Sequence, residues 1–361
     1  MLAITEDNLI TPVPSSSQVV FDEEKLLIYR ELYYDGFSSI IAARDLTTGA
    51  AVAVKKIEFR FLKPAPFPLE NLKERYARKI NQQAAKIRAL TPNSVVKMME
   101  FAIESNRVTI MTEMCMFGDL FNWMLQQPQL RIRDICLVVQ NIFQALRFLH
   151  SQNYVHGALS PTTILFQSMS PQSVTIMPDC SVRSEVLQLV RIEPPIMDCF
   201  SPEQLKAIVS EQQAANSFVP TEASDVWSVG IIAHIAFTGK APFRGTNASE
   251  LLATIERADG KTSNKIFSTL SSLIQKQIHN ALSVDPGSRT TADEGSEVFW
   301  FDDEHTKNDN RNILLTIEYE LLNTCRRYRN QGRQVFERVF RHATTTVSQK
   351  LATHCNILPE S

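Results

Sequence analysis

The sequence predicts an α+β protein with a small, strand-rich N-terminal lobe and a larger, mostly helical C-terminal lobe. Two observations support this class. Short apolar or alternating runs fill the region from Leu27 to Phe59, whereas apolar residues at helical spacing dominate beyond Gly118. The 361 residues are also enough for one bilobal domain of about 250 to 300 residues with additional tails.

The first lobe is expected to be an antiparallel sheet with one main helix. The runs LLIYREL, SSIIAARDL and AAVAVKKIEF read as a meander, with a turn at Thr48-Gly49. VVKMMEFAIE and RVTIMTEM are two further strand candidates. Residues 71–90 are rich in helix formers and stop before Thr91-Pro92-Asn93, which indicates the main helix.

Helices are expected throughout the second lobe. The most regular apolar stripe predicts a central core helix and consists of Ile135, Val138, Val139, Ile142, Phe143, Leu146 and Leu149. A second, uniformly apolar helix is predicted to begin at Asp225, with Ser224 as its cap, and to end near Thr238-Gly239. Residues 313–347 have an amphipathic helical pattern that Gly332 interrupts.

Composition excludes several classes of protein. With 37 basic and 39 acidic side chains the formal net charge is −2, so no uniform field attracts nucleic acid or an anionic membrane. No apolar run approaches the ~20 residues of a membrane span, and the N-terminus lacks the pattern of a secretion signal. The six cysteines have no metal-ligand spacing, so free thiols and no metal site are expected. These features predict a cytoplasmic location, with the nucleus as a second compartment.

Six ordered motifs resemble the eukaryotic protein kinase family over roughly Leu27 to Phe301. They are VAVKK at 52–56, TEMC at 112–115, FLHSQNYVHGALSPTTIL at 148–165, SPE at 201–203, SDVWSVGIIAHIAFTGKAPF at 224–243 and LSVDPGSRTTADE at 282–294. The resemblance implies a bilobal protein-kinase-like fold over residues 26–302, with a small lobe at 26–114 and a large lobe at 118–302. A flexible arm is expected at 1–25 and a helical tail at 303–361.

The resemblance assigns structural roles to four residues of the large lobe. Glu203 is expected to form a buried ion pair with Arg289. Asp225 is expected to hold the loop backbone near His156, whose own ring is expected to be packed in the core. Because an uncompensated partner of a buried pair costs about 3 to 5 kcal/mol, retention of these residues predicts an intact fold.

Three positions in the small lobe and the hinge would surround a nucleotide if the resemblance holds. VAVKK makes Lys55 the phosphate-binding lysine, and Glu113 and Cys115 belong to the hinge segment between the lobes. The alternative for Lys55 is a surface lysine beside Lys56, because its helix partner is uncertain: Gln82, Gln83 or Glu74, depending on register. ATP bound without magnesium is the cofactor that the resemblance implies.

The groups that transfer phosphate are replaced in this sequence. In the motif HRDLKPxNIL the aspartate position is Ala158, the lysine position is Ser160 and the metal-binding asparagine position is Thr163. The metal-binding DFG falls on Pro178-Asp179-Cys180, or on Asp179-Cys180-Ser181 if one residue is inserted. The glycine-rich loop is degraded too, since its three glycine positions are Tyr33, Asp35 and Ser38, with Gly36 out of register.

The sequence therefore predicts a catalytically inactive pseudokinase, most similar to the STRAD group of adaptors. That resemblance implies a client serine/threonine protein kinase, activated allosterically, and an armadillo-type scaffold protein as partners. Two alternatives remain open. One is a weakly active atypical serine/threonine kinase that uses Asp179, and the other is a Tribbles-like adaptor that recruits proteins through its tail, where RRYRNQGRQVFERVFRH is either a solvated basic face or a partner-binding helix.

Overall fold

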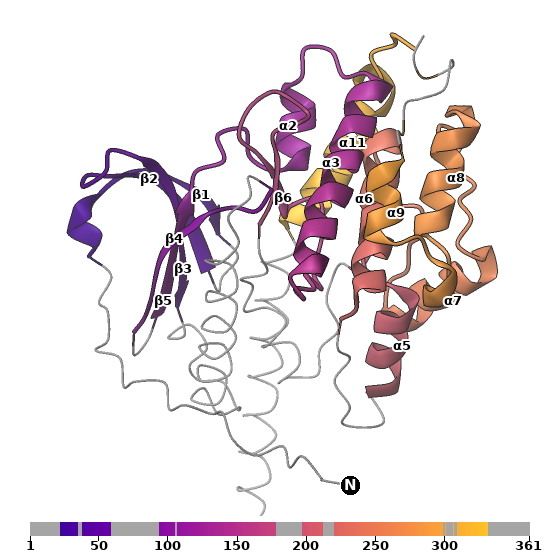
Figure 1. The fold of residues 1–361 in the computed structure, drawn as a ribbon, viewed down its shortest axis with the longest axis horizontal. Coiled ribbons are helices and arrows are strands. Elements are labelled where there is room, and N and C mark those ends of the chain that lie inside the picture. Colours follow the sequence, from indigo (N-terminus) through magenta and orange to yellow (C-terminus); the bar gives the residue numbers. More distant parts are fainter. Residues whose placement is uncertain are drawn as a thin grey trace, which may run out of the picture.

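The computed structural model has two lobes, a β-sheet lobe and a helical lobe (Figure 1). It describes residues 22–34, 38–58, 94–104, 107–177, 197–211, 220–298, 300, 306 and 309–330. The predicted helix at 71–90 and both DFG registers lie outside the described residues, as do most of the predicted N-terminal arm and the tail beyond residue 330. The α+β class and the two lobes confirm the fold expected from the sequence.

The N-lobe is one antiparallel sheet in the order β1-β2-β3-β5-β4. Alternation places Val52, Val54 and Ile57 of β3 in the core, and β3 pairs with β2 on one side and β5 on the other. The predicted meander and the two further strands are thus confirmed. The strands are β1 (Leu26–Tyr34), β2 (Ser38–Asp45), β3 (Ala51–Glu58), β4 (Met98–Ile103) and β5 (Arg107–Glu113).

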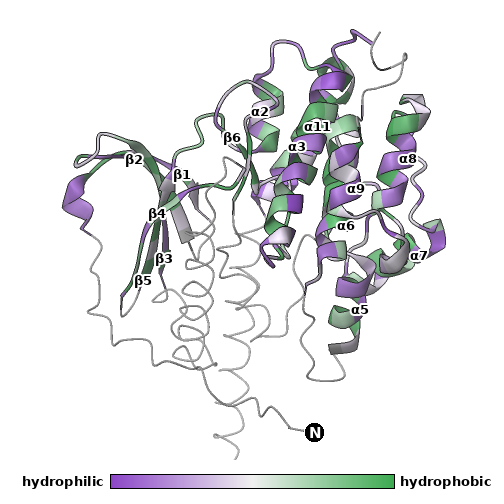
Figure 2. Ribbon diagram, viewed as in Figure 1, coloured by the Kyte–Doolittle hydropathy of each residue, from purple (hydrophilic) through white to green (hydrophobic). Residues whose placement is uncertain are grey.

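A short 3-10 helix, η1 (Glu23–Lys25), attaches the chain just before β1 to this sheet. The carboxylate of Glu23 accepts hydrogen bonds from Lys56 Nζ at 2.7 Å and from Arg107 Nη1 at 2.6 Å. The two cations beside it lower the pKa of Glu23, with the Lys56 hydrogen bond as the largest cause. η1 is the hydrophilic, purple segment at the outer end of the sheet in Figure 2. The last residues of the predicted arm are therefore held against β3 and β5.

The C-lobe is organised around α3 (Ile132–Ser151) and α6 (Glu222–Thr238). The predicted stripe of α3 is buried throughout, and nearly every residue of α6 is buried, as its uniformly apolar sequence predicts. Around them lie α2 (Leu120–Gln126), α5 (Pro202–Glu211), α7 (Ala248–Ala258), η3 (Phe267–Thr269), α8 (Ser272–Ala281), η4 (Pro286–Ser288), α9 (Ala292–Glu297) and α11 (Leu314–Arg329). No helix in the described part of the chain is both long and apolar enough to span a membrane.

The start of α6 differs from the prediction. Ser224 was expected to cap a helix beginning at Asp225, but α6 begins at Glu222 and its N-cap is Thr221. The Thr221 hydroxyl accepts from Ser224 N at 3.2 Å, and the Ser224 hydroxyl accepts from Thr221 N at 3.0 Å. This reciprocal capping box places Ser224 inside the first turn, because two orphan N–H groups are satisfied three residues earlier than expected. The predicted end is confirmed by Gly239, which has a φ of +78°.

α11 packs into the C-lobe core. Its buried residues Ile317, Leu321 and Tyr328 belong to the same core cluster as α3 and α6. A Cβ on Gly239 would lie 2.8 Å from the Ile317 carbonyl oxygen, so the α11 backbone rests directly on the end of α6. The Thr324 hydroxyl also donates to the Gly239 carbonyl at 2.7 Å. The first part of the predicted tail is thus an integral layer of the C-lobe.

Candidate functional site

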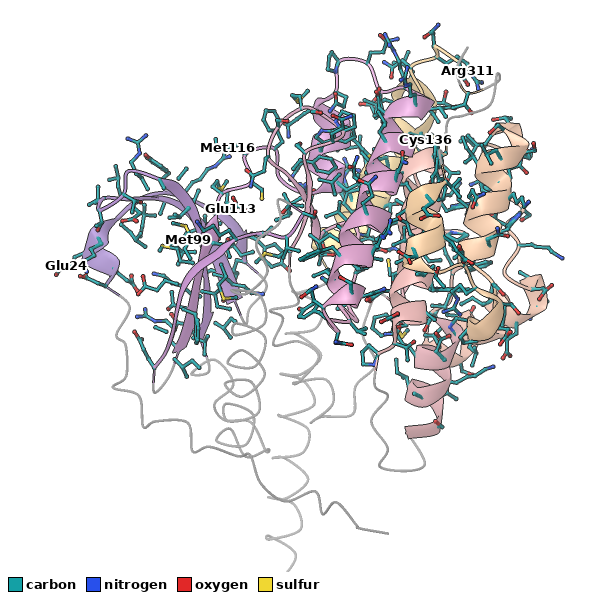
Figure 3. The ribbon with its side chains drawn as sticks, viewed as in Figure 1. Glu24, Met99, Glu113, Met116, Cys136 and Arg311 are labelled. Atoms are coloured by element: carbon teal, nitrogen blue, oxygen red, sulfur yellow. The ribbon has the colours of Figure 1, made fainter. Side chains whose placement is uncertain are left out.

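The connection between the lobes is the segment that follows β5. Figure 3 places Glu113 at the end of β5 and Met116 on this connection. Glu113 is fixed to the residue just before β4, since its N–H donates to the Lys97 carbonyl at 3.0 Å and its carboxylate accepts from Lys97 N at 2.8 Å. Met114 N donates to the Ala51 carbonyl at 3.3 Å, so the start of the connection is also fixed to β3.

Cys115 is buried within the connection. Burial, with the nearby charge of Glu113, raises the pKa of its thiol to about 12, so the thiol stays protonated. The Cys115 carbonyl accepts from Gly118 N at 3.1 Å in a tight turn, and Gly118 has a φ of +70°. Cys115 is therefore a packing residue with a protonated thiol.

A two-stranded hairpin, β6 (Ile164–Phe166) and β7 (Val174–Ile176), joins the two lobes. On the C-lobe side Phe166 N donates to the Gly118 carbonyl at 3.0 Å. On the N-lobe side Ile176 N donates to the Ser94 carbonyl at 2.9 Å, and Val96 N donates to the Ile176 carbonyl at 3.1 Å. The hairpin is thus hydrogen-bonded to both lobes and fixes the position of the loop before it, residues 156–163, relative to each of them.

Asp225 anchors the start of that loop from the first turn of α6. Its carboxylate accepts from His156 N at 2.8 Å and from Gly157 N at 2.7 Å, as predicted. A third partner was not predicted: His150 Nε2, at the end of α3, lies 3.0 Å from the same carboxylate. Asp225 is 1 % exposed, and these three donors satisfy a charge that would otherwise be costly to bury.

The His156 ring links the loop to Met177, the residue that follows β7. Ala158 N donates to Nδ1 at 3.2 Å, so the ring proton is assigned to Nε2, which donates to the Met177 carbonyl at 2.8 Å. Both ring nitrogens are occupied and the residue is buried. This arrangement agrees with the expected structural role of His156.

The remainder of the loop is closed by its own hydroxyl groups. The Thr163 hydroxyl donates to the Ser160 carbonyl and accepts from Ser160 N, each at 3.0 Å. Ser160 Oγ lies 2.9 Å from Thr162 Oγ1. Ala158, at the predicted aspartate position, contributes only a methyl group. The side chains at the three replaced positions thus either lack a polar atom or bind within the loop.

Glu203 and Arg289 form the predicted ion pair beside this loop. Arg289 Nη1 and Nη2 bind the two carboxylate oxygens of Glu203 at 2.9 and 3.2 Å, a bidentate geometry. Arg289 also donates to the carbonyls of Ala223 and Ser283 and stacks over Trp227, 5.2 Å from the ring centroid. The Arg289 side chain has no exposed surface and the Glu203 side chain is 21 % exposed, so the pair is a largely buried structural element.

Lys55 lies in the middle of β3, opposite Ile40 of β2 and Ile110 of β5. Its neighbour Lys56 points to the other face and binds Glu23. The three alternative helix partners of Lys55, Gln82, Gln83 and Glu74, lie outside the described residues. Over the described ranges no group of three or more His, Cys, Asp or Glu residues could hold a metal ion.

Comparison with known proteins agrees with the two-lobe geometry. A profile described as the protein kinase domain matches residues 35–301. This chain belongs to the protein kinase family. The human serine/threonine-protein kinase H1 is 24 % identical over 289 residues, covering 79 % of this chain but 63 % of the relative. A calcium/calmodulin-dependent protein kinase type 1 from Caenorhabditis briggsae is 25 % identical over 291 residues, covering 80 % of this chain and 75 % of the relative.

Solved kinase structures share the fold of this family member. The twitchin kinase region from C. elegans superposes with a TM-score of 0.65 at 18 % identity, covering 85 % of this chain and 52 % of that one. At this identity the likeness concerns the fold alone. The chain spans a little under two thirds, 63 %, of the first curated relatives that it matches.

Membership in the family identifies one site residue that the sequence analysis passed over. Gly157 stands at the arginine position of HRDLKPxNIL. It has a φ of +75°, and a Cβ built on it would lie 2.7 Å from Pro220 Cγ. A side chain here would therefore need both a strained backbone and a displaced proline. The signal was present in the aligned motif, one position before Ala158.

Proposed function

We propose that this member of the kinase family is a pseudokinase that acts by binding a partner serine/threonine kinase. The observation that carries the proposal is the loop of residues 156–163. Phosphoryl transfer needs a carboxylate near the acceptor hydroxyl and ligands for magnesium. Ala158 offers a methyl group that cannot accept a proton, and the Thr163 hydroxyl already binds the Ser160 backbone.

The proposed mechanism is allosteric. A protein that binds only the active conformation of its client shifts the client's equilibrium by the difference in affinity, and ~1 to 3 kcal/mol changes activity about 5- to 150-fold. The intact frame of Asp225, Glu203 and Arg289 supports a fixed binding surface. Following the resemblance to the STRAD group, we propose that the client docks on residues 179–203 and on residues 71–90, where the sequence predicts a helix. Of these, residues 197–203 lie within the described part.

A phosphate-transfer assay tests the loss of chemistry. Purified full-length chain is incubated with labelled ATP and magnesium or manganese, beside Lys55→Ala as the matched control. We expect no signal that depends on Lys55. Transfer by the wild type that Lys55→Ala abolishes would refute the pseudokinase proposal and favour the weakly active kinase, for which Asp179 would be the remaining candidate metal ligand.

Nucleotide binding is a separate proposal. We propose that ATP binds without magnesium between Lys55 and the backbone of Glu113 and Cys115, supported by the position of Lys55 in β3 and by the fixed connection that follows β5. Ligand at 100-fold above its Kd stabilises a protein by about 2.7 kcal/mol. A rise in melting temperature with millimolar ATP, with or without magnesium and reduced in Lys55→Ala, is expected. An unchanged melting temperature in both conditions would remove ATP from the proposal.

Client binding is tested with the kinase itself. Affinity capture of the full-length chain from source cells would identify bound kinases, and an armadillo-type scaffold if one is present. Each captured kinase is then purified, and its kcat is measured with and without this chain. We expect an increase of about 5- to 150-fold. A bound kinase whose kcat does not change would contradict activation. Capture should succeed from the cytoplasmic fraction, where we propose that the protein resides, and we name the nucleus as a second location.

A Tribbles-like adaptor predicts a different result, because it recruits partners through the tail. A deletion that tests this must begin after Asn330, since α11 supplies Ile317, Leu321 and Tyr328 to the core. Loss of every partner in the 1–330 chain would favour the tail adaptor. Retention of a kinase partner by the same chain would favour docking on the kinase-like domain.

A further inference from the structure

Three consecutive residues at the end of α11 contact two separate parts of the C-lobe. Arg327 forms an ion pair with Asp198, and the Tyr328 hydroxyl lies 3.4 Å from Cys199 Sγ. Asp198 and Cys199 lie just before α5, in the segment that ends at the SPE motif. Arg329 turns the other way, donating to the Asn122 side chain and lying 3.8 Å from the carboxylate of Asp119.

The contacts of Arg327 and Tyr328 are partly or fully buried, so they can contribute to stability. The Asp198 side chain is 5 % exposed, and the side chain of its ion-pair partner Arg327 is 32 % exposed. The Tyr328 residue is 4 % exposed and its ring packs against Phe121 of α2, with centroids 5.5 Å apart. Removing one partner of a buried pair is far more costly than removing an exposed one. The end of α11 thus packs between α2 and residues 197–201.

The segment at 197–201 is also held by α6. The Ser228 hydroxyl of α6 donates to the Cys199 carbonyl at 2.8 Å, which fixes the backbone. The side chains of Asp198 and Cys199 face α11. Asp119, for its part, caps α2 by accepting from Asn122 N at 2.9 Å. The residues that the end of α11 contacts therefore lie at or just before the start of a helix: Asp119 caps α2, and Asp198 and Cys199 precede α5. α2 directly follows the connection between the lobes.

We infer that Arg327, Tyr328 and Arg329 form a clasp through which the C-terminal segment controls the conformation of residues 197–201 and of α2. When the clasp is closed, both helix starts are held. When the clasp is open, both helix starts are released together. This coupling stands whether or not the protein binds a kinase. If it does bind one, the clasp couples the proposed docking surface at 197–203 to the position of α11.

Hydrogen–deuterium exchange of the full-length chain tests the clasp with a matched pair of variants. Arg327→Gln removes the ion pair with Asp198, whereas Arg326→Gln removes the same charge from an exposed neighbour on the same turn. We expect amides of residues 197–205 to exchange at least about tenfold faster in Arg327→Gln, and to be unchanged in Arg326→Gln. Amides of α6 serve as the internal reference and should not change.

Equal exchange at 197–205 in the two variants would overturn the inference. Arg327→Gln could instead increase exchange throughout the C-lobe, including α6. In that case the double variant Asp198→Arg with Arg327→Asp, which exchanges the two charges, tests the ion pair. The clasp predicts that this double variant regains protection at 197–205, because the opposite charges again face each other. Failure to regain it would show that the ion pair does not couple the two segments.

Discussion

The frame of Asp225, Glu203 and Arg289 lies beside the loop at 156–163, but the two regions are stabilised by different interactions. The frame is built from paired charges: the buried Asp225 with three donors, and the buried Arg289 with the partly exposed Glu203. The loop holds a methyl group and hydroxyls that bind only one another and the loop backbone. The requirements for folding and for phosphate transfer are therefore separable, and this sequence keeps the groups that serve folding.

The largest expected effect is on the frame. Arg289→Ala leaves Glu203 without its partner and the carbonyls of Ala223 and Ser283 without a donor, so the free energy of unfolding should fall by about 3 to 5 kcal/mol. Urea unfolding measures it. The control is Arg147→Ala, which breaks an exposed pair with Asp293 and should cost about 1 kcal/mol or less. An equal fall in the free energy of unfolding in the two variants would show that the Glu203–Arg289 pair is no more important for folding than an exposed pair.

Acid should also weaken the frame through His234 of α6. Burial lowers the pKa of His234 from its ordinary 6.5 to about 4, while the ring contacts the Lys240 carbonyl and the Thr262 hydroxyl. Since the unfolded chain binds the proton more tightly, stability is highest above pH about 6.5 and falls as the pH drops toward 4, by up to about 3 kcal/mol.

The matched control for this pH dependence is His234→Gln. It keeps a polar side chain but cannot be protonated in this range, so its free energy of unfolding should fall less steeply between pH 7 and pH 5 than that of the wild type. The difference between the two slopes isolates His234 from the carboxylates that also titrate below pH 5. Parallel slopes would show that His234 is not a source of acid sensitivity.

A smaller effect is expected within the loop. Thr163→Val keeps the shape of the side chain but removes the hydroxyl that donates to the Ser160 carbonyl and accepts from Ser160 N. The loss of two partly exposed hydrogen bonds should cost about 1 to 2 kcal/mol, measured by urea unfolding. If Thr163→Val lowered the free energy of unfolding as much as Arg289→Ala does, the loop would be as important for folding as the Glu203–Arg289 pair.

The smallest effect is expected for Ala158→Asp, which restores the carboxylate of the family motif. Ala158 is partly exposed, so a charged side chain can remain hydrated and the free energy of unfolding should change by less than about 1 kcal/mol. Phosphate transfer should remain absent, because Ser160 and Thr163 are unchanged. Measurable transfer by this single variant would show that the rest of the site is already competent.

Periodicity was sufficient to predict most of the described fold. The alternating runs gave the strands of the sheet, and the stripe from Ile135 to Leu149 gave α3, because these patterns are local and each depends on one buried face. The capping box at Thr221 was missed, since an apolar run starting at Asp225 marks the buried part of a helix rather than its first turn.

Contacts between distant segments were predictable only where a family motif supplied both partners. This is how Glu203 and Arg289 were paired correctly. His150 on Asp225 and Arg327 on Asp198 were not predicted, because a helical pattern shows that a face is buried but not what covers it. For the same reason the amphipathic pattern after Ile313 indicated a helix but not its place in the C-lobe core.

The position of α11 also has a consequence for how fast the protein refolds. Leu130 N binds the Asn312 side chain across 182 positions, and Arg329 reaches Asn122 across 207. Closing such long loops is slow relative to forming local helices and hairpins. After dilution from denaturant the sheet should regain its structure early. The helical lobe should complete its tertiary packing in a later phase that ends when the last layer docks.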